Sequence, residues 1–408
     1  MRPRAGREAE ARVAPLDARH LARWIRLRNR AFGGRTAEDD AAVRANLAAR
    51  LPWTRGTFVA GEPVATGTWF PFRAYVGGVP VVTGALGGVA SAPEHRRQGH
   101  VRALLWHGLH ELHSQGVGLA LEHPFDPRFY GALGFASVAA GVRLHAPLDR
   151  VAGDPKRAAF EEVGAGADDE MLAVRDVFAQ GHTFAFLRDW RPDGEAPPHA
   201  RQWTGLFDPP TEGATRPLAY RTTDGYAIVA TDGFGSEGTL HVVDAAWRDA
   251  AGRRRVLDLL GAWRGQVDRI LIDLPAADPL ARDEAPRHTA PRAILQARIV
   301  DVAAALRPLR GPRDAAPRDD VIEVDDSFCD WNAGRWRVRV GPEGCEATPT
   351  EAEAAARVDV RGLAAVLAGV PPAALQAAGL ADGDPAALAP LAGTVASHPP
   401  FLGGADYF

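Results

Sequence analysis

The 408-residue sequence contains only two cysteines and no long apolar segment. Cys329 and Cys345 could in principle be bridged, but the N-terminus is polar and lacks the apolar core of a secretory signal, so we expect two reduced thiols. The sequence holds no run of about 20 apolar residues that could span a bilayer as a helix. These absences argue against a disulfide-rich secreted protein and a helical membrane protein, and they predict a cytoplasmic location.

Lysine is almost absent, and the chain carries little net charge. Lys156 is the only lysine, so the cations are nearly all arginines, and the net charge is −4. This balance gives no general reason to expect nucleic acid or an anionic membrane as a partner. Apolar residues make up 46% of the chain and charged residues 24%, which is typical of a globular protein. The length predicts two or three domains.

The most informative stretch runs from residue 89 to residue 105. Its pattern predicts a short apolar strand, a turn at Pro93, a basic loop and an amphipathic helix. Backbone N–H groups at a helix N-terminus are unpaired and the helix dipole favours negative charge there, so this order of elements suits a pyrophosphate. Gly99 lets the backbone approach closely, and Arg96 and Arg97 can add charge-assisted hydrogen bonds. For the loop alone, a solvated basic helix start is the alternative interpretation.

A second motif follows a predicted buried strand at residues 117–122. The next segment places Tyr130, Gly134 and Phe135 in a Tyr-x-x-x-Gly-Phe pattern. A phenol with a pKa near ~10 is an adequate proton donor to a thiolate with a pKa of roughly 8.5, so a catalytic role is chemically reasonable. The alternative is a core aromatic like its neighbours.

The chain ends on an aromatic residue, Phe408. With the Arg96-x-x-Gly99 loop and the tyrosine motif, this end makes the chain resemble the Eis (enhanced intracellular survival) acetyltransferases, a branch of the GCN5-related N-acetyltransferases. The resemblance implies acetyl-CoA as co-substrate, Tyr130 as general acid and the C-terminal carboxylate of Phe408 as general base. An α-carboxylate has an ordinary pKa of roughly 3.5, so relay through water or a raised pKa would be needed. The alternative is a C-terminus that frays in solvent.

The same resemblance assigns the acetyl-CoA contacts. Backbone at Val89 and Ser91 would hold the acetyl carbonyl, and the basic loop with the first helical turn would hold the pyrophosphate. The predicted loop contacts are Arg96, Arg97, Gln98, Gly99 and His100.

The resemblance covers most of the chain and predicts a mixed α/β (α+β) fold. Two acetyltransferase folds would stand in tandem, at residues 1–148 and 149–306, followed by a sterol-carrier-protein-like domain at residues 307–408. After Asp244 the second copy has no glycine where Gly99 stands in the first, so we expect a degenerate cofactor site there. The Pro-, Arg- and Asp-rich segment at 307–320 predicts the last linker.

Aromatic side chains predict the acceptor pocket. The predicted acceptor-site residues are Trp24, Phe32, Trp69 and Glu122. Glu122 and His123 are also the alternative candidates for a base. In the family, members that acetylate aminoglycosides bind a polycation through acidic residues, but here Tyr407 precedes Phe408 and residues 30–35 contain no carboxylate. A less cationic amine is therefore at least as well supported as an aminoglycoside.

Three histidines, His107, His110 and His113, share one face of the predicted helix. No carboxylate or cysteine in the pattern supports a metal, so we interpret them as a solvated face and expect no metal.

The sequence as a whole predicts an acetyl-CoA-dependent N-acetyltransferase acting on a small-molecule amine, either aminoglycoside-like or another natural-product amine, by direct attack on the thioester. Two alternatives stay open. One is acetylation of a lysine in a protein or peptide, and the other is a non-catalytic sensor of acyl-CoA or of a hydrophobic ligand. By family resemblance the protein would be a homo-oligomer, hexameric in the family.

Overall fold

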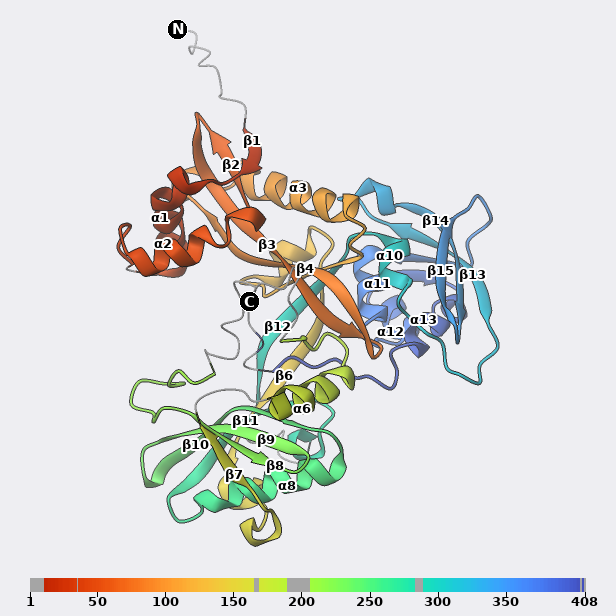
Figure 1. Cartoon of the computed structure of the whole chain (residues 1–408). Helices are drawn as coiled ribbons and strands as arrows, with labels where there is room; N and C mark the ends of the chain where they lie inside the picture. Colours follow the sequence, from red (N-terminus) through yellow and green to blue (C-terminus); the bar gives the residue numbers. More distant parts are fainter. Residues whose placement is uncertain are drawn as a thin grey trace.

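The computed structural model describes residues 11–34, 36–164, 169–188, 206–282, 289–403 and 406. Within this part of the chain there are two β-sheets, one of twelve strands and one of five (Figure 1). We call β1 to β6 the first repeat, β7 to β12 the second repeat, and β13 to α13 the C-terminal unit.

The first repeat builds one half of the large sheet. Its strands are β1 (Arg12–Pro15), β2 (Thr54–Val59), β3 (Glu62–Val76), β4 (Val79–Ser91), β5 (Leu119–Glu122) and β6 (Ala136–Pro147). Its α-helices are α1 (Leu21–Phe32), α2 (Ala41–Ala48), α3 (His100–Ser114), α4 (Pro127–Gly131) and α5 (Leu148–Val151). Helices α1 and α2 lie on one side of the sheet and α3 on the other (Figure 1). On α1 the apolar side chains recur at helical spacing, so Leu21, Trp24 and Ile25 are buried against the strands.

The second repeat follows the same order of elements. Its strands are β7 (Glu161–Gly164), β8 (Leu218–Thr222), β9 (Gly225–Asp232), β10 (Gly235–Trp247), β11 (Val267–Pro275) and β12 (Thr289–Ile299). Its main helices are α6 (Asp169–Gln180) and α8 (Ala250–Leu260). In both repeats the fourth and fifth strands pair in parallel, β4 with β5 and β10 with β11.

The two repeats exchange their last strands. The sheet order is β1-β2-β3-β4-β5-β12-β6-β11-β10-β9-β8-β7. Strand β12 of the second repeat pairs with β5 of the first, and β6 of the first repeat pairs with β11 of the second. These two strands also pair with each other in the middle of the sheet (Figure 1). Each repeat is therefore completed by a strand from the other.

The C-terminal unit packs on this central part of the large sheet. Its strands, in sheet order, are β15 (Gly344–Pro349), β14 (Gly334–Gly341), β13 (Arg318–Asp325), β16 (Ala356–Asp359) and β17 (Ala381–Gly383). Its helices are α11 (Val360–Val366), α12 (Pro372–Ala377) and α13 (Ala389–Gly393), and α10 (Val302–Leu306) leads into the unit. Helix α11 contacts both β12 and β6. One hydrophobic core joins the units, with Leu121, Leu295 and Leu363 among its members.

After α13 the chain returns to the boundary between the repeats. Pro400 forms a β-bridge with Thr183. The carbonyl oxygen of Leu402 lies so close to β6 that a Cβ on Gly141 would come within 2.5 Å of it. Among the described residues, no helix is long and apolar enough to cross a membrane.

Candidate active site

Strand β4 parts from β5 at the predicted cofactor loop. The parallel pairing runs only from Thr83 to Leu86 on β4, opposite Leu119 to Glu122 on β5. Past Leu86, β4 carries one extra residue relative to β3 and continues to Ser91 without pairing to β5 in the described part of the chain. Such a bulge bends a strand and frees its backbone groups. The N–H and C=O groups near Val89 are thereby available to a ligand between the two strands.

The loop after β4 leaves the N-terminus of α3 open. Gly99 is the residue before the helix, with a φ of +83°, and no side chain caps the first turn. Arg97 also has a positive φ, +61°, which is costly for a residue other than glycine and is found most often at functional sites. Thr57 on β2 donates its hydroxyl to the His100 carbonyl at 2.9 Å and fixes the helix start. The unpaired N–H groups of this turn can therefore bind a phosphate.

A cavity of about 560 Å³ lies at this helix start. Six of the seven predicted acetyl-CoA contacts line it: Val89, Ser91, Arg96, Arg97, Gly99 and His100. Gln98 is not part of the lining and instead donates its side-chain amide to the Glu94 carbonyl at 3.2 Å. Burial, and then His95, lowers the pKa of His100, so this residue is neutral at physiological pH. The positive charge of the cavity comes from arginines.

The equivalent helix N-terminus in the second repeat, at α8, is capped by the side chain of Asp249. Asp249 precedes α8, and its carboxylate accepts a hydrogen bond from the Gly252 N–H at 2.7 Å. A capping carboxylate occupies a backbone N–H donor and also repels an approaching anion. The helix start that can bind a phosphate in one repeat is thus closed in the other.

Helix α4 places Tyr130 beside the end of β5. The Tyr130 side chain is buried, and its ring packs edge-on against Phe125, Phe129 and Phe135. Burial, and then the nearby Glu122, raises the pKa of Tyr130 well above its ordinary value. The phenol therefore keeps its proton at neutral pH and can donate it.

Glu122 is buried at the C-terminal end of β5. Its Oε1 has no hydrogen-bond partner within the described part of the chain. Burial raises the pKa of this carboxyl to about 9, so it is protonated at neutral pH. A neutral carboxyl group is a poor base and offers no charge to a cationic acceptor.

Two side chains of the exchanged strand β12 hold the segment that carries Tyr130. Gln296 donates its amide to the Pro127 carbonyl, at the start of α4, and to the Ser137 hydroxyl, both at 3.2 Å. Arg298 is fully buried and packs so closely on Gly134 that a Cβ there would lie 2.8 Å from the guanidinium. The same guanidinium donates to both carboxylate oxygens of Asp326 in the C-terminal unit, at 2.8 and 2.7 Å. Sequence reasoning missed both residues, because they lie about 160 positions from the motif they support.

The predicted acceptor residues do not come together in one site in the structure. Phe32 is 58% exposed and lines the cavity at α3, where Phe125, 73% exposed, lies on the same lining. Trp24 and Trp69 are buried in hydrophobic clusters and do not line this cavity. Phe125 was not predicted, although it lies only three residues after Glu122 in the sequence.

The predicted base, Phe408, lies outside the described residues, but Asp406 is described. Its carboxylate is fully buried and accepts hydrogen bonds from Arg175 at 3.0 and 3.1 Å and from Arg188 at 2.8 and 3.1 Å. Burial alone would raise the pKa of Asp406, but the two guanidiniums and hydrogen bonds to the carboxylate lower it to about 2. Arg188 also binds Asp244 on β10. The tail is therefore tied to the second repeat close to its end.

The tail fills the place where β10 and β11 part. Their parallel pairing ends at Val242, and Asp244 follows beyond it. The remaining cavity measures about 10 Å³, room for about one water molecule. Phe401, Gly403 and Asp406 of the tail form part of its wall. The second repeat thus holds the tail where the first repeat leaves an open cavity.

The histidines of α3 contact the C-terminal unit and acidic neighbours. His113 stacks on Trp331 and lies 3.0 Å from Asp301, and the ring of His110 meets Trp331 edge-on. His107 lies 3.4 Å from Glu111. Within the described residues, no group of three or more His, Cys, Asp or Glu side chains could hold a metal ion.

Comparison with known proteins identifies two of the units. Residues 12–138 match the acetyltransferase (GNAT) domain family, and residues 301–403 match the sterol carrier protein domain family. An uncharacterized N-acetyltransferase of Streptomyces coelicolor is 32% identical over 345 aligned residues, covering 78% of this chain and 79% of that protein.

Solved structures share the whole fold. A GCN5-related N-acetyltransferase from Anabaena variabilis superposes with a TM-score of 0.82 at 18% identity, covering 98% of this chain and all of that one. Eis1 from Mycobacterium abscessus gives a TM-score of 0.78 at 23% identity, with 98% and 100% coverage. The chain belongs to the family of GCN5-related N-acetyltransferases, and it shares with Eis1 the fold of tandem acetyltransferase units followed by a sterol carrier protein domain.

Proposed function

We propose that the first repeat transfers the acetyl group of acetyl-CoA to an amine of a small molecule. The observation that carries the proposal is the difference between the repeats. The first has an open cavity at an uncapped helix N-terminus with Arg96 and Arg97 on its lining, and the second has a capping Asp249 at the matching position. Acetyl-CoA would place its pyrophosphate at α3 and its thioester beside the backbone of Val89 and Ser91.

Tyr130 is the proposed general acid. The amine nitrogen attacks the thioester carbonyl carbon, the C–S bond breaks, and the departing thiolate takes the phenolic proton of Tyr130. The raised pKa of Tyr130 keeps the phenol protonated before the reaction, and it also makes the phenol a weaker acid than an exposed tyrosine. The hydrogen bonds of Gln296 to Pro127 and Ser137 keep α4, and with it Tyr130, in place.

The C-terminal carboxylate of Phe408 is the proposed general base, which takes the proton lost by the attacking ammonium. Asp406 supports this assignment because it anchors the chain two residues before its end, and two residues span at most about 7 Å. The segment that holds Asp406 also touches the first repeat: the ring of Phe186 lies 6.5 Å from that of His123, the residue after β5, and Arg188 follows two residues later.

The proposed acceptor is an amine that carries apolar surface. The cavity at α3 has no carboxylate among the lining residues that the structure describes, and Phe32 and Phe125 expose their rings there. With Arg96 and Arg97 occupied by the pyrophosphate, these rings remain for the acceptor, and no carboxylate of the described lining could pair with a polycation such as an aminoglycoside. Other natural-product amines therefore fit this lining better than aminoglycosides do. The domain boundaries at 148/149 and 306/307, the cytoplasmic location and the homo-oligomer are part of the same proposal.

Release of free thiol from acetyl-CoA, measured with a panel of amines of increasing charge, tests the proposal. We expect amine-dependent release by the native protein and a loss in kcat of about 10²- to 10⁴-fold in Tyr130→Phe. Tyr75→Phe is the matched control, because Tyr75 is also a buried tyrosine but its hydroxyl already donates to Asp176 at 2.8 Å. Equal kcat in Tyr130→Phe and Tyr75→Phe would refute Tyr130 as the acid. Acetyl-CoA binding without thiol release, for any amine or lysine peptide, would favour a sensor.

A further inference from the structure

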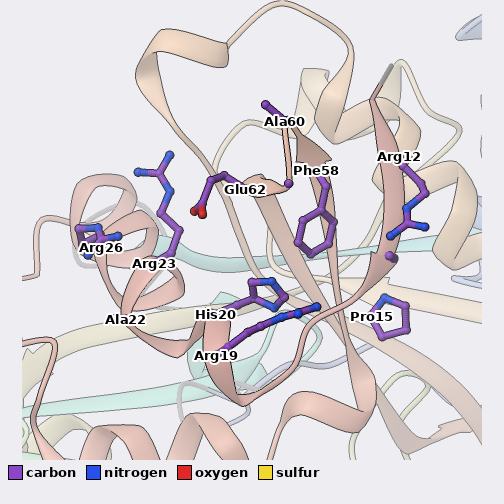
Figure 2. A pocket seen from close by; sticks show the side chains of 12 residues that line it. Arg12, Pro15, Arg19, His20, Ala22, Arg23, Arg26, Phe58, Ala60 and Glu62 are labelled. Carbon is purple, nitrogen blue, oxygen red and sulfur yellow. The ribbon is translucent and has the colours of Figure 1, made fainter. Parts of the chain in front are cut away.

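A second cavity, of about 760 Å³, lies beside α1 at the edge of the large sheet (Figure 2). It is bounded by the edge strand β1, the first turns of α1 and the turn between β2 and β3. The lining residues with charged or aromatic side chains are Arg12, Arg19, His20, Arg23, Arg26, Phe58 and Glu62. It shares no lining residue with the cavity at α3. Acetyl transfer in the first repeat therefore does not account for it.

Among the described residues, four guanidiniums surround this cavity, and Glu62 supplies the single carboxylate of the lining. Arg12 has no ion pair with any residue that the structure describes. Arg23 donates to the Pro63 carbonyl at 3.3 Å and lies 3.9 Å from Glu94. The excess of positive charge contrasts with a chain whose net charge is −4. Like charges gathered around a cavity raise the local concentration of anions.

The other two arginines have partners that leave donors for a ligand. Arg19 lies 3.0 Å from Asp17 but is 79% exposed, and Arg26 bonds to Glu38 through Nη1. A guanidinium carries five N–H donors, so one ion pair does not exhaust it. A guanidinium binds two phosphate oxygens in a bidentate way, which an ammonium cannot do.

An apolar surface stands among these charges. The ring of Phe58 packs edge-on against His20, with ring centroids 5.1 Å apart. In Figure 2 the Phe58 ring stands between Arg12 on one side and Arg23 with Glu62 on the other. Ligand sites typically combine such an apolar wall with a few polar groups, in volumes of roughly 300–1,000 Å³.

We propose that this cavity binds a phosphorylated small molecule with a flat ring, such as a nucleoside monophosphate. The phosphate would lie between the guanidiniums of Arg12 and Arg19, and the ring would lie on Phe58. The site is independent of acetyl transfer, so its test needs no active enzyme.

Calorimetric titration of the full chain with adenosine monophosphate at low salt tests the proposal. The double variant Arg12→Gln/Arg19→Gln removes two of the four guanidiniums, and we expect its affinity to fall at least about tenfold. Glu62→Gln removes the single carboxylate, and we expect the affinity to rise about two- to fivefold. Arg157→Gln is the matched control, because Arg157 is 76% exposed, lies near an aspartate and does not line the cavity.

Two further titrations separate this site from the acetyl-CoA cavity and test the phosphate. Arg96→Gln/Arg97→Gln changes only the lining of the cavity at α3 and should leave the affinity for adenosine monophosphate unchanged, and adenosine without a phosphate should bind at least about tenfold more weakly. Unchanged affinity in Arg12→Gln/Arg19→Gln, lost affinity in Arg96→Gln/Arg97→Gln, or equal binding of adenosine would each overturn the proposal.

Discussion

Arg188 holds Asp406 by two hydrogen bonds, from Nη2 at 2.8 Å and from Nε at 3.1 Å, only two residues before the end of the chain. Both side chains are buried, and Arg175 adds two more hydrogen bonds to the same carboxylate. Since Asp244 of the second repeat binds Arg188 as well, the tail and the second repeat share one charge network. The second repeat thus holds the tail at Asp406.

Loss of the charge on Asp406 should destabilise the protein strongly. In Asp406→Asn, two buried guanidiniums lose their shared anion, so we expect the free energy of unfolding at pH 7 to fall by about 3–5 kcal/mol. Urea unfolding measures the change. Asp325→Asn is the control, because its pair with Arg357 is exposed and should change stability by less than about 1 kcal/mol. Equal effects of the two substitutions would refute a buried anchor.

The ion pairs of Asp406 with Arg175 and Arg188 predict that the stability of the protein falls in acid. The pKa of Asp406 is about 2 in the folded state and about 3.9 in the unfolded state, so the folded state favours the ionised form. Its contribution is present above about pH 4 and is lost as the pH falls toward 2, by on the order of 2–3 kcal/mol in total. The difference in unfolding free energy between the native chain and Asp406→Asn should narrow over that range. A difference that stays constant down to pH 2 would contradict the lowered pKa.

Glu122→Gln should stabilise the protein at high pH and leave activity intact. The pKa of Glu122 is raised to about 9 by burial, whereas the unfolded value is about 4.3. The unfolded chain therefore loses this proton first, and the native protein loses stability as the pH rises from about 4.3 toward 9, by on the order of 1 kcal/mol per pH unit. The glutamine variant lacks this loss. Unfolding measured at pH 5.5 and 8.5, with kcat at pH 7, checks both points. A collapse of kcat would make Glu122 the base instead.

Gly134→Ala should cost more than Gly131→Ala, although both glycines lie in the tyrosine motif. Gly134 has a φ of +86°, and a Cβ there would press on the Arg298 guanidinium. We expect a loss of about 1–3 kcal/mol. Gly131 lies in helix α4, and a Cβ added there would meet no atom within 4 Å, so alanine should be neutral or stabilising by up to about 1 kcal/mol. Thermal unfolding ranks the two variants. A loss at Gly131 as large as that at Gly134 would refute the close packing on Arg298.

The family resemblance was enough to predict the tandem fold, and local pattern was enough to predict the strand, loop and helix around Gly99. The strand, the basic loop and the helix around Gly99 are each determined by residues close together in the sequence. Gly99 itself allows the positive φ that precedes the uncapped helix. The exchange of β6 and β12 is different, because pairing between distant strands leaves no mark within either strand. Gln296 and Arg298 were missed for that reason.

The sequence predicted less well which aromatic side chains are buried. Trp24, Phe32 and Trp69 have similar apolar character, but only Phe32 reaches the cavity. Helix α1 turns Trp24 inward and ends at Phe32, so the position on the helix decides exposure. Nothing in the residues around Asp406 indicates that its side chain is buried, since its partners Arg175 and Arg188 are more than 200 positions away.

The most direct test of the central claim is kcat for an untagged chain whose terminal carboxylate is displaced by one residue. Deleting Phe408, or adding one glycine after it, moves that carboxylate by about 3.5 Å while Asp406 stays anchored. We predict a fall in kcat of at least about 100-fold in both variants, with little change in the KM for acetyl-CoA. Phe408→Leu keeps the carboxylate in register and should retain most of the activity. Undiminished kcat in the displaced variants would contradict a catalytic C-terminus.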